Sequence, residues 1–363
     1  MSAGDSNASA TPGRPAPRVS VIIAFLNPGP YLAEAIDSVV AQTLTDWELL
    51  IVDDGSSDES SLIAKQWAQR MPHQVRYLEH PGHVNLGPGA SRNLGMRAAS
   101  GDYVAFLDAD DTYLPDRLAA HVSILDALPS VDMVQSDHIY WYCWEDRKGR
   151  RQEEECRRPP LFIGDAMIHA PDGLSLLFGV PDAFTATCSV TVRRTAALEL
   201  GGFEDQFRSL YEDQVFLTKV YAHKVVYALQ GYHAKYRLHA EGTLSAAMAN
   251  ACGSQSLLNA SDRKLREWQN GYLAELLETD RDVRDLLADH TRRAQGTEGA
   301  LLQGLLGGCR RAAHGIVRSC LPVHAYRRVL QRRQSWSAER ARRQHAVLCE
   351  RRSMSKVIRH HVT

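Results

Sequence analysis

The sequence predicts an α/β fold built on a central, mostly parallel sheet with helices packed on it. Short apolar runs rich in β-branched residues, at 18–25, 48–52 and 103–107, have the composition of strands buried on both faces. Segments with the apolar periodicity of helices lie between them. Alternating strands and helices form parallel neighbours joined by right-handed crossovers, so the alternation itself indicates the fold class.

The first half of the chain alternates regularly. The run RVSVIIAF ends at Asn-Pro-Gly-Pro, after which Leu32, Ile36 and Val39 recur with the spacing of one helix face. The next strand, ELLIV, runs into an acidic turn, where Ser57 or Asp58 can cap a further helix. The remaining elements expected here are a strand at 74–78, a helix at 87–99 and a strand at 103–107.

The second half of the chain is less regular. The charged stretch DRKGRRQEEECRRPP at 146–160 ends in two prolines, which predicts a surface loop. Gly201 and Gly202 indicate a sharp turn. The elements expected after the loop are a strand at 186–192, a helix at 212–222, a strand at 225–229 and a helical, Arg-rich pattern from about residue 257.

Composition places the chain among globular proteins rather than disordered or membrane-spanning ones. Its 363 residues are 44% apolar and 23% charged, and no apolar run reaches the roughly 18 residues that a spanning helix needs. Seven cysteines without CxxC spacing disfavour structural zinc and a disulfide framework, so we expect a reducing, cytoplasmic location. The Ser/Ala/Gly/Pro-rich residues 1–17 lack the order of a signal peptide and are expected to form a disordered leader.

Charge is divided unevenly along the chain. Residues 292–363 hold 16 Lys and Arg against 3 Asp and Glu, whereas residues 1–291 hold 26 against 40. We therefore expect an α/β domain at 18–250 and a helical, basic region at 251–363. That region could lie on an anionic leaflet at the inner face of the cell membrane, or pack on the protein with a solvated basic face. Nucleic acid is a less favoured partner, because the body is acidic and lacks a recognition motif.

Acidic and glycine-rich clusters follow the predicted strands, at the edge of a parallel sheet where ligands bind. The carboxylates within 108–111 suit Mg²⁺ or Mn²⁺, although an acidic turn before a helix has the same appearance. Asp53 and Asp54 could accept from a nucleobase or a ribose, or form an ordinary strand-to-helix turn. The loop at 85–93 contains glycines, and Arg92 near the start of a helix could meet a phosphate.

Two further polar groups come later in the chain. Glu212 and Asp213 stand at the start of a predicted helix, where a carboxylate can act as a general base toward a hydroxyl or simply cap the helix. His239 could complete a metal site as a neutral imidazole, although a single histidine is more often structural.

The order and spacing of these pieces resemble the bacterial family 2 glycosyltransferases, which have the GT-A fold. The resemblance covers residues 18–245 and rests on the segments VSVIIAFLN, AIDSVVAQT, WELLIVDDGSSD, NLGPGASRNLG, GDYVAFLDADD, GGFEDQF, YEDQVFLTKV and YRLH. It implies an inverting, metal-dependent enzyme of the hexosyl- or N-acetylhexosaminyltransferase type. Such an enzyme moves a sugar from a nucleotide diphosphate sugar, with UDP-sugar expected first, to a glycan, glycolipid or other hydroxyl acceptor in cell-surface polysaccharide or glycoconjugate synthesis.

The resemblance also implies roles for individual residues. Asp213 is similar to the family's catalytic base, and Glu212 to a group that positions the base or the sugar. The implied Mn²⁺ or Mg²⁺ would be held by Asp110, with Asp111 and His239 beside it. The implied nucleotide-sugar contacts are Ala24, Leu26, Asn27, Asp53, Asp54, Gly87, Arg92, Asp108, Ala109 and Arg237.

One position departs from the family pattern. The family commonly has Pro-x-Tyr-Asn after the first strand, and here Leu26 replaces the aromatic residue that can stack on the base. The nucleotide preference depends on this position. Two other functions stay open. A sugar-nucleotide pyrophosphorylase would need a Gly-rich, Arg-containing loop directly after the first strand, and a nucleotide-sugar binding protein would lack turnover.

Overall fold

A computed structural model of the protein describes residues 16–145, 151–157, 164–174, 185–239 and 251–284. The chain divides into two compact units, 1–312 and 313–363, and every described residue lies in the first. The predicted leader, except residues 16 and 17, and the basic residues 285–363 therefore lie outside the described residues.

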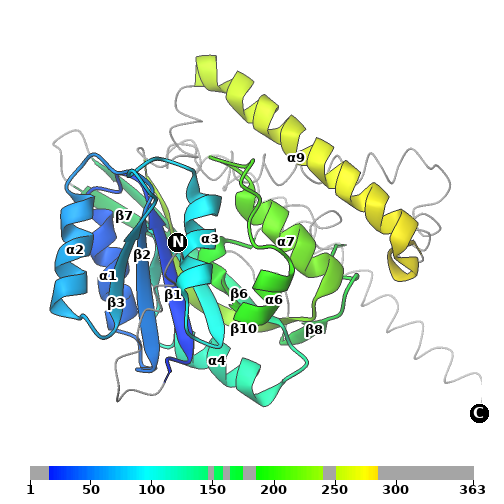
Figure 1. Ribbon diagram of the computed structural model, residues 1–363, viewed down its shortest axis with the longest axis horizontal. Helices are drawn as coiled ribbons and strands as arrows, with labels where there is room; N and C mark the ends of the chain where they lie inside the picture. Colours follow the sequence, from blue (N-terminus) through cyan, green and yellow to red (C-terminus); the bar gives the residue numbers. More distant parts are fainter. Residues whose placement is uncertain (1–15, 146–150, 158–163, 175–184, 240–250, 285–363) are drawn as a thin grey trace, which may run out of the picture. The chain divides into compact units, whose positions relative to one another are not determined.

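One mixed sheet organises the described residues (Figure 1). Its strands are β1 (Val19–Phe25), β2 (Trp47–Asp53), β3 (Val75–Glu79), β4 (Tyr103–Asp108), β5 (Thr112–Tyr113), β6 (Met133–Glu145), β7 (Arg151–Cys156), β8 (Ala166–Ile168), β9 (Val190–Arg193) and β10 (Val226–Leu238). The helices are α1 (Tyr31–Val40), α2 (Ser60–Arg70), α3 (Pro88–Ala98), α4 (Arg117–Ala127), α6 (Arg194–Glu199), α7 (Glu212–His223) and α9 (Ala251–Thr279). The strands run in the order β3-β2-β1-β4-β9-β6-β10-β5, with β7 paired to β6 and β8 to β10.

Parallel pairing dominates this sheet. β1 lies between β2 and β4 and is parallel to both, so their carboxyl ends, at Phe25, Asp53 and Asp108, meet at one edge. β3 continues this parallel set, and β6 runs parallel to β10, while β9 is antiparallel to its neighbours β4 and β6. The predicted α/β class with a mostly parallel sheet is confirmed.

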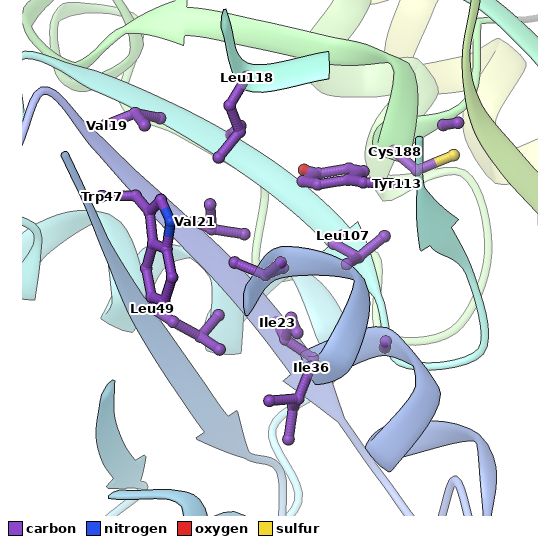
Figure 2. Close-up of a cluster of buried hydrophobic side chains, with 14 of the residues drawn as sticks. Val19, Val21, Ile23, Ile36, Trp47, Leu49, Leu107, Tyr113, Leu118 and Cys188 are labelled. Atoms are coloured by element: carbon purple, nitrogen blue, oxygen red, sulfur yellow. The ribbon is translucent and has the colours of Figure 1, made fainter. Parts of the chain in front are cut away.

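The core forms on both faces of the sheet, because successive side chains of a strand point to opposite sides. Val19, Val21 and Ile23 of β1 join a cluster that α1, α2 and α4 complete (Figure 2). Ile22 of the same strand joins a second cluster with residues of α3, α6, α7 and α9. Burial on both faces explains why these strands are apolar throughout rather than alternating.

The prediction of a surface loop at 146–160 is wrong over part of its length. Residues Arg151–Cys156 form β7, which pairs antiparallel with β6. The pairing brings a charged strand beside an aromatic one, and Nε1 of Trp141 donates to Oε2 of Glu153 at 3.1 Å. Charged residues suit a strand outside the main path of the sheet, because its side chains meet water. The loop's other residues, 146–150 and 158–160, lie outside the described residues.

Two strands differ in extent from the prediction. The expected strand at 186–192 begins with a 3-10 turn at Thr187–Ser189 and becomes β9 only from Val190. The expected strand at 225–229 continues to Leu238, because β10 shifts register twice against β6 and then resumes the pairing. This extension places residues 236–239 beside the carboxyl edge of β4.

Helix α9, at the start of the helical region expected at 251–363, packs on the described body. Leu273, Leu276 and Val283 share a core cluster with residues of α7, and α9 lies along α7 (Figure 1). The border between the two compact units lies at 312/313. Within the described ranges, no helix is long and apolar enough to cross a membrane.

Candidate active site

The acidic clusters meet where α3 and α7 begin, at the carboxyl end of β4. Arg92 of α3 donates from Nη1 to Oε1 of Glu212 at 2.8 Å and from Nη2 to Oδ1 of Asp108 at 2.5 Å. The guanidinium carbon of Arg92 lies 5.3 Å from the ring centroid of Phe203. The two helices approach closely at Gly89, where a Cβ would lie 3.6 Å from the Cβ of Glu212. One buried arginine thus joins the sheet edge to both helices.

Burial and pairing set the charges of this triad. Burial lowers the pKa of Arg92, but the carboxylates of Asp108 and Glu212 more than offset that effect and raise it overall. Burial also raises the pKa of Asp108, which Arg92 opposes and Asp110 reinforces. Arg92 therefore stays positively charged, and its charge favours the ionised form of Asp108.

Asp213 stands next to this triad in the first turn of α7. Burial and, second, the charge of Glu212 raise the pKa of Asp213 to about 7, although Arg92 and hydrogen bonds from Gln214 act in the opposite direction. The residue is partly exposed, so another molecule can reach it. A carboxylate that gains and loses its proton near neutral pH is suited to general base catalysis.

The residue before α7 has an uncommon backbone conformation. Tyr211, the N-cap of α7, has φ 70° and ψ 8°, in the left-handed region. A non-glycine residue there is strained and is held by its surroundings, and such residues are concentrated at functional sites. Among the described residues, no side chain caps this end of α7.

The predicted metal residues separate into two groups. Nε2 of His239 lies 3.0 Å from Oδ2 of Asp110, and the Asp110 side chain is 33% exposed. Asp111 instead turns inward, is 1% exposed, and accepts the backbone N–H of Arg237 at 2.8 Å. Burial raises the pKa of Asp111 well above its usual range, as do Asp110 and Asp108. Asp111 therefore joins the turn to β10, and Asp110 and His239 face each other.

These residues partly fit a divalent cation. Within the described ranges, no group of three or more His, Cys, Asp or Glu side chains could hold a metal ion. Asp110 and His239 are two suitable donors, and Nδ1 of His239 is buried without a hydrogen-bond partner in the part of the chain that the structure describes. Mg²⁺ and Mn²⁺ are often bound by one or two protein ligands plus phosphate oxygens of a substrate. The donor set fits an ion shared with a diphosphate.

Arg237 does not face a donor as expected. Its side chain is 0% exposed, and its guanidinium carbon lies 3.8 Å from the ring centroid of Trp141 and 4.7 Å from that of Tyr31. Nη2 donates to Oε2 of Glu34 at 2.5 Å, and Nε donates to the carbonyl oxygen of Asp110 at 2.5 Å. A guanidinium enclosed by rings and paired with a carboxylate cannot reach a phosphate, so Arg237 positions the turn at Asp110.

The other end of the site is organised by two adjacent carboxylates. Asp54 is 3% exposed and accepts the backbone N–H groups of Leu86 and Gly87, from 2.8 to 3.1 Å. Asp53 is 0% exposed and accepts from the N–H of Ser56, with Ser61 and Tyr77 as further donors. Asp53 was expected to contact the donor, but its carboxylate is wholly committed inside the protein.

The remaining predicted donor contacts lie at the ends of β1 and β4 and at the start of α3. Leu26 is 46% exposed directly after β1, and Asn27 accepts the N–H of Ser57 at 2.7 Å, so both lie at the open edge of the sheet. Gly87 caps α3 with φ 95°, where a Cβ would lie 2.8 Å from Cα of Arg208. Ala24 is partly buried between Val52 and Asp108, and Ala109 is 7% exposed.

Sequence reasoning missed the residues that hold Arg237. Tyr31 and Glu34 lie on α1, and Trp141 lies on β6, a strand that the pattern did not predict. Glu34 lies between the apolar residues of an amphipathic helix. A charged residue next to an apolar face was the sequence signal that could have indicated a buried ionic partner at this position. Its partner is 203 residues away in the sequence, which no local pattern can connect.

Residues 20–180 match the family model described as Glycosyl transferase family 2. The chain contains a family 2 glycosyltransferase domain. The resemblance drawn from the motifs is confirmed. The matched residues include Asp54, Arg92, Asp108 and Asp110, whereas Asp213 and His239 lie beyond them.

Curated relatives are also glycosyltransferases. An uncharacterized glycosyltransferase of Nostoc is 42% identical over 107 residues, covering 30% of this chain and 32% of that protein. An uncharacterized glycosyltransferase of Rickettsia prowazekii is 26% identical over 241 residues, covering 64% of this chain and 67% of that protein. The alignments thus span from about a third to two thirds of the length of these relatives.

One solved structure similar to this chain is Staphylococcus aureus TarS 1-349. It has a TM-score of 0.48 and 18% sequence identity, covering 86% of this chain and 91% of that one.

Proposed function

We propose that this chain is an inverting, metal-dependent glycosyltransferase that moves a sugar from a nucleotide diphosphate sugar to an acceptor hydroxyl. The observation that carries the proposal is Asp213, a reachable carboxyl whose pKa is raised to about 7, beside a buried Arg92–Asp108–Glu212 triad. The pyrophosphorylase alternative is less well supported, because such an enzyme has no need of a base for an acceptor hydroxyl.

The proposed donor spans the edge of the sheet from Asp54 to Asp110. A carboxylate has about four lone-pair sites, and three hydrogen bonds from Leu86 and Gly87 leave Asp54 able to accept from a base N–H. Uracil has such a group and guanine does too, so this contact is compatible with both UDP and GDP. The N-termini of α3 and α7 meet nearby, where helix dipoles favour the negative charge of a diphosphate.

The proposed transfer is a single displacement. Asp213 takes the proton of the acceptor hydroxyl while the hydroxyl oxygen attacks the anomeric carbon. The bond from that carbon to the diphosphate oxygen breaks on the opposite face. Asp110 and His239 would hold a divalent cation, which when bound would neutralise the departing diphosphate. Arg92 keeps Asp108 and Glu212 in place on either side of the reacting groups.

The acceptor is proposed more broadly, as a glycan, a glycolipid or another hydroxyl compound of a cell-surface polysaccharide or glycoconjugate. The association of the basic residues 292–363 with an anionic membrane remains a prediction. Flotation of the full chain with anionic liposomes, against the chain truncated at residue 291, tests it. Equal flotation of the two proteins would count against a membrane role.

The function is tested by nucleotide release from a panel of UDP- and GDP-sugars in the presence of Mn²⁺. Asp213→Asn should still bind the donor, measured by thermal shift, but lose about 10²–10⁴ in rate. Asp102→Asn is the matched control, because Asp102 is 69% exposed at the opposite end of β4. Undiminished turnover by Asp213→Asn would refute the base, and full activity in excess chelator would refute the metal.

A further inference from the structure

We infer that α9 positions the catalytic segment of this transferase. This inference rests on the proposed function. The positioned part, called here the base segment, is residues 206–215, which includes Asp213. The basic region at 251–363 was expected to bind a membrane or to pack on the α/β domain. Neither expectation assigns α9 a part in catalysis.

The contacts of α9 with the base segment come from one helix face. Nζ of Lys264 donates to the carbonyl oxygen of Gln206 and lies 5.0 Å from the ring centroid of Phe207. Leu265, 4% exposed, packs with Phe207 and Val215 in a separate small cluster. One turn later, the ring of Trp268 meets that of Phe207 edge-on, with 6.4 Å between centroids. Phe207 is therefore held on several sides by α9.

The same face continues along α7. Nε2 of Gln269 donates to Oγ1 of Thr218 at 3.3 Å, and Nε2 of His223 lies 2.8 Å from the hydroxyl oxygen of Tyr272. The base segment and the rest of α7 are thus attached to one helix, so a shift of α9 would move them together.

From Phe207 the contacts lead to the donor end of the site. Arg208, the next residue, donates from Nη2 to the carbonyl oxygen of Asn85. Its backbone also lies against Gly87, whose missing side chain makes the close approach possible. The N–H of Gly87 donates to Asp54. The base segment therefore links α9 to Asp54, the carboxylate proposed to recognise the nucleobase.

The contacts also lead to Asp213. Tyr211 packs against the Phe207 cluster and has the strained backbone conformation that precedes α7. A strained residue persists only where surrounding packing fixes it. The packing of Leu265 and Trp268 restrains this end of α7 from one side, while the ion pair of Glu212 with Arg92 holds it from the other. Loss of that packing would let the first turn of α7, with Glu212 and Asp213, shift relative to Arg92.

Two leucines of α9 give a matched pair of variants. Leu265→Ala removes a buried contact with the base segment, whereas Leu277→Ala removes a side chain that is 36% exposed on the same helix. Both changes replace leucine with alanine within a helix, so their effects on helix propensity are alike. Lys264→Met is a second test variant, since it removes from an exposed position both the donor to Gln206 and the positive charge near the Phe207 ring.

The assay measures UDP release from UDP-glucose and UDP-N-acetylglucosamine with Mn²⁺ and water as the acceptor. Leu265→Ala should lower kcat about tenfold to a hundredfold, because small misplacements of catalytic groups have effects of that size. Lys264→Met should lower it about threefold, as expected for one hydrogen bond. Both variants should also shift the acid limb of the pH profile, since Asp213 and Glu212 would move relative to Arg92, whose charge lowers the pKa of Asp213. Leu277→Ala should match the wild type.

Amide hydrogen exchange gives a readout that does not need turnover. Amides of residues 206–213 should exchange faster in Leu265→Ala and Lys264→Met than in Leu277→Ala, while β1 and β4 stay protected. Unchanged exchange, or wild-type kcat and pH profile in both test variants, would overturn the inference while leaving the proposed function intact. A different result would overturn the proposed function and keep the structural link. In that case the wild type releases no UDP, but residues 206–213 still exchange faster in Leu265→Ala and Lys264→Met than in Leu277→Ala.

Discussion

The pH dependence of turnover should follow the carboxyl group of Asp213. Because burial and Glu212 raise its pKa to about 7, about a tenth of the molecules have an ionised Asp213 at pH 6 and about nine tenths at pH 8. Only the ionised form can take a proton from the acceptor. The rate of UDP release should therefore rise about ninefold between these two pH values, with its midpoint near pH 7.

The neighbouring carboxylate provides the decisive variant. Replacing Glu212 with glutamine keeps an oxygen that can accept from Arg92 at the same place, but removes the negative charge that disfavours ionisation of Asp213. The pKa of Asp213 should fall, and the acid limb should move to lower pH by on the order of one unit, since the partial exposure of the site screens the interaction.

The assay is kcat/KM for UDP release between pH 5 and 9 at constant ionic strength. Donor binding by thermal shift over the same range separates ionisation of the protein from that of the diphosphate. A limb that stays in place in Glu212→Gln would show that the group titrating near pH 7 is not Asp213, and the assignment of the base would be lost.

Three further outcomes are expected. Asp213→Asn should unfold at a higher temperature than the wild type at pH 8. The reason is that ionisation of the partly exposed Asp213, whose usual pKa is 3.8, costs stability as pH rises from about 4 through about 7; equal melting below pH 4 is the internal control. Gly87→Ala should weaken donor affinity and cost about 1–3 kcal/mol of unfolding free energy, because φ is 95° and a Cβ would meet Arg208, whereas Gly271→Ala on α9 meets nothing within 4 Å and should be harmless. Glu34→Gln should raise the Mn²⁺ concentration needed for half-maximal activity, since Arg237 would hold Asp110 less firmly; an unchanged Mn²⁺ requirement would contradict that role.

The sequence patterns predicted the strands whose formation depends on residues close together in the chain. The apolar runs became β1, β2 and β4, with boundaries within a residue or two, because strands buried on both faces need continuous apolar sequence. The strand β7 was missed for the converse reason. Its residues RQEEEC have no apolar pattern, and only the neighbouring β6 makes them a strand.

The candidate site was predictable where a motif marks a strand end or a helix start. Asp54, Asp108, Asp110 and Asp213 lie at such places, and parallel neighbours bring strand ends to one edge whatever the rest of the chain does. Asp53 and Asp111 stand beside them in the same motifs, and like Asp54 they are at most 3% exposed, whereas Asp108, Asp110 and Asp213 are partly exposed. Adjacent residues of an extended chain point to opposite sides, and the sequence does not say which side is open.

The sequence by itself determined the fold class, the family and the edge of the sheet where chemistry is expected, because each depends on patterns within a few tens of residues. The tertiary structure alone decided which carboxylates remain reachable, that Arg92 is shared by Asp108 and Glu212, and that Arg237 is enclosed by Tyr31, Trp141 and Glu34. It also decided that α9 packs on the helix that begins with Glu212 and Asp213. These pairings join residues far apart in the chain, and their charge states depend on burial that only the folded protein provides.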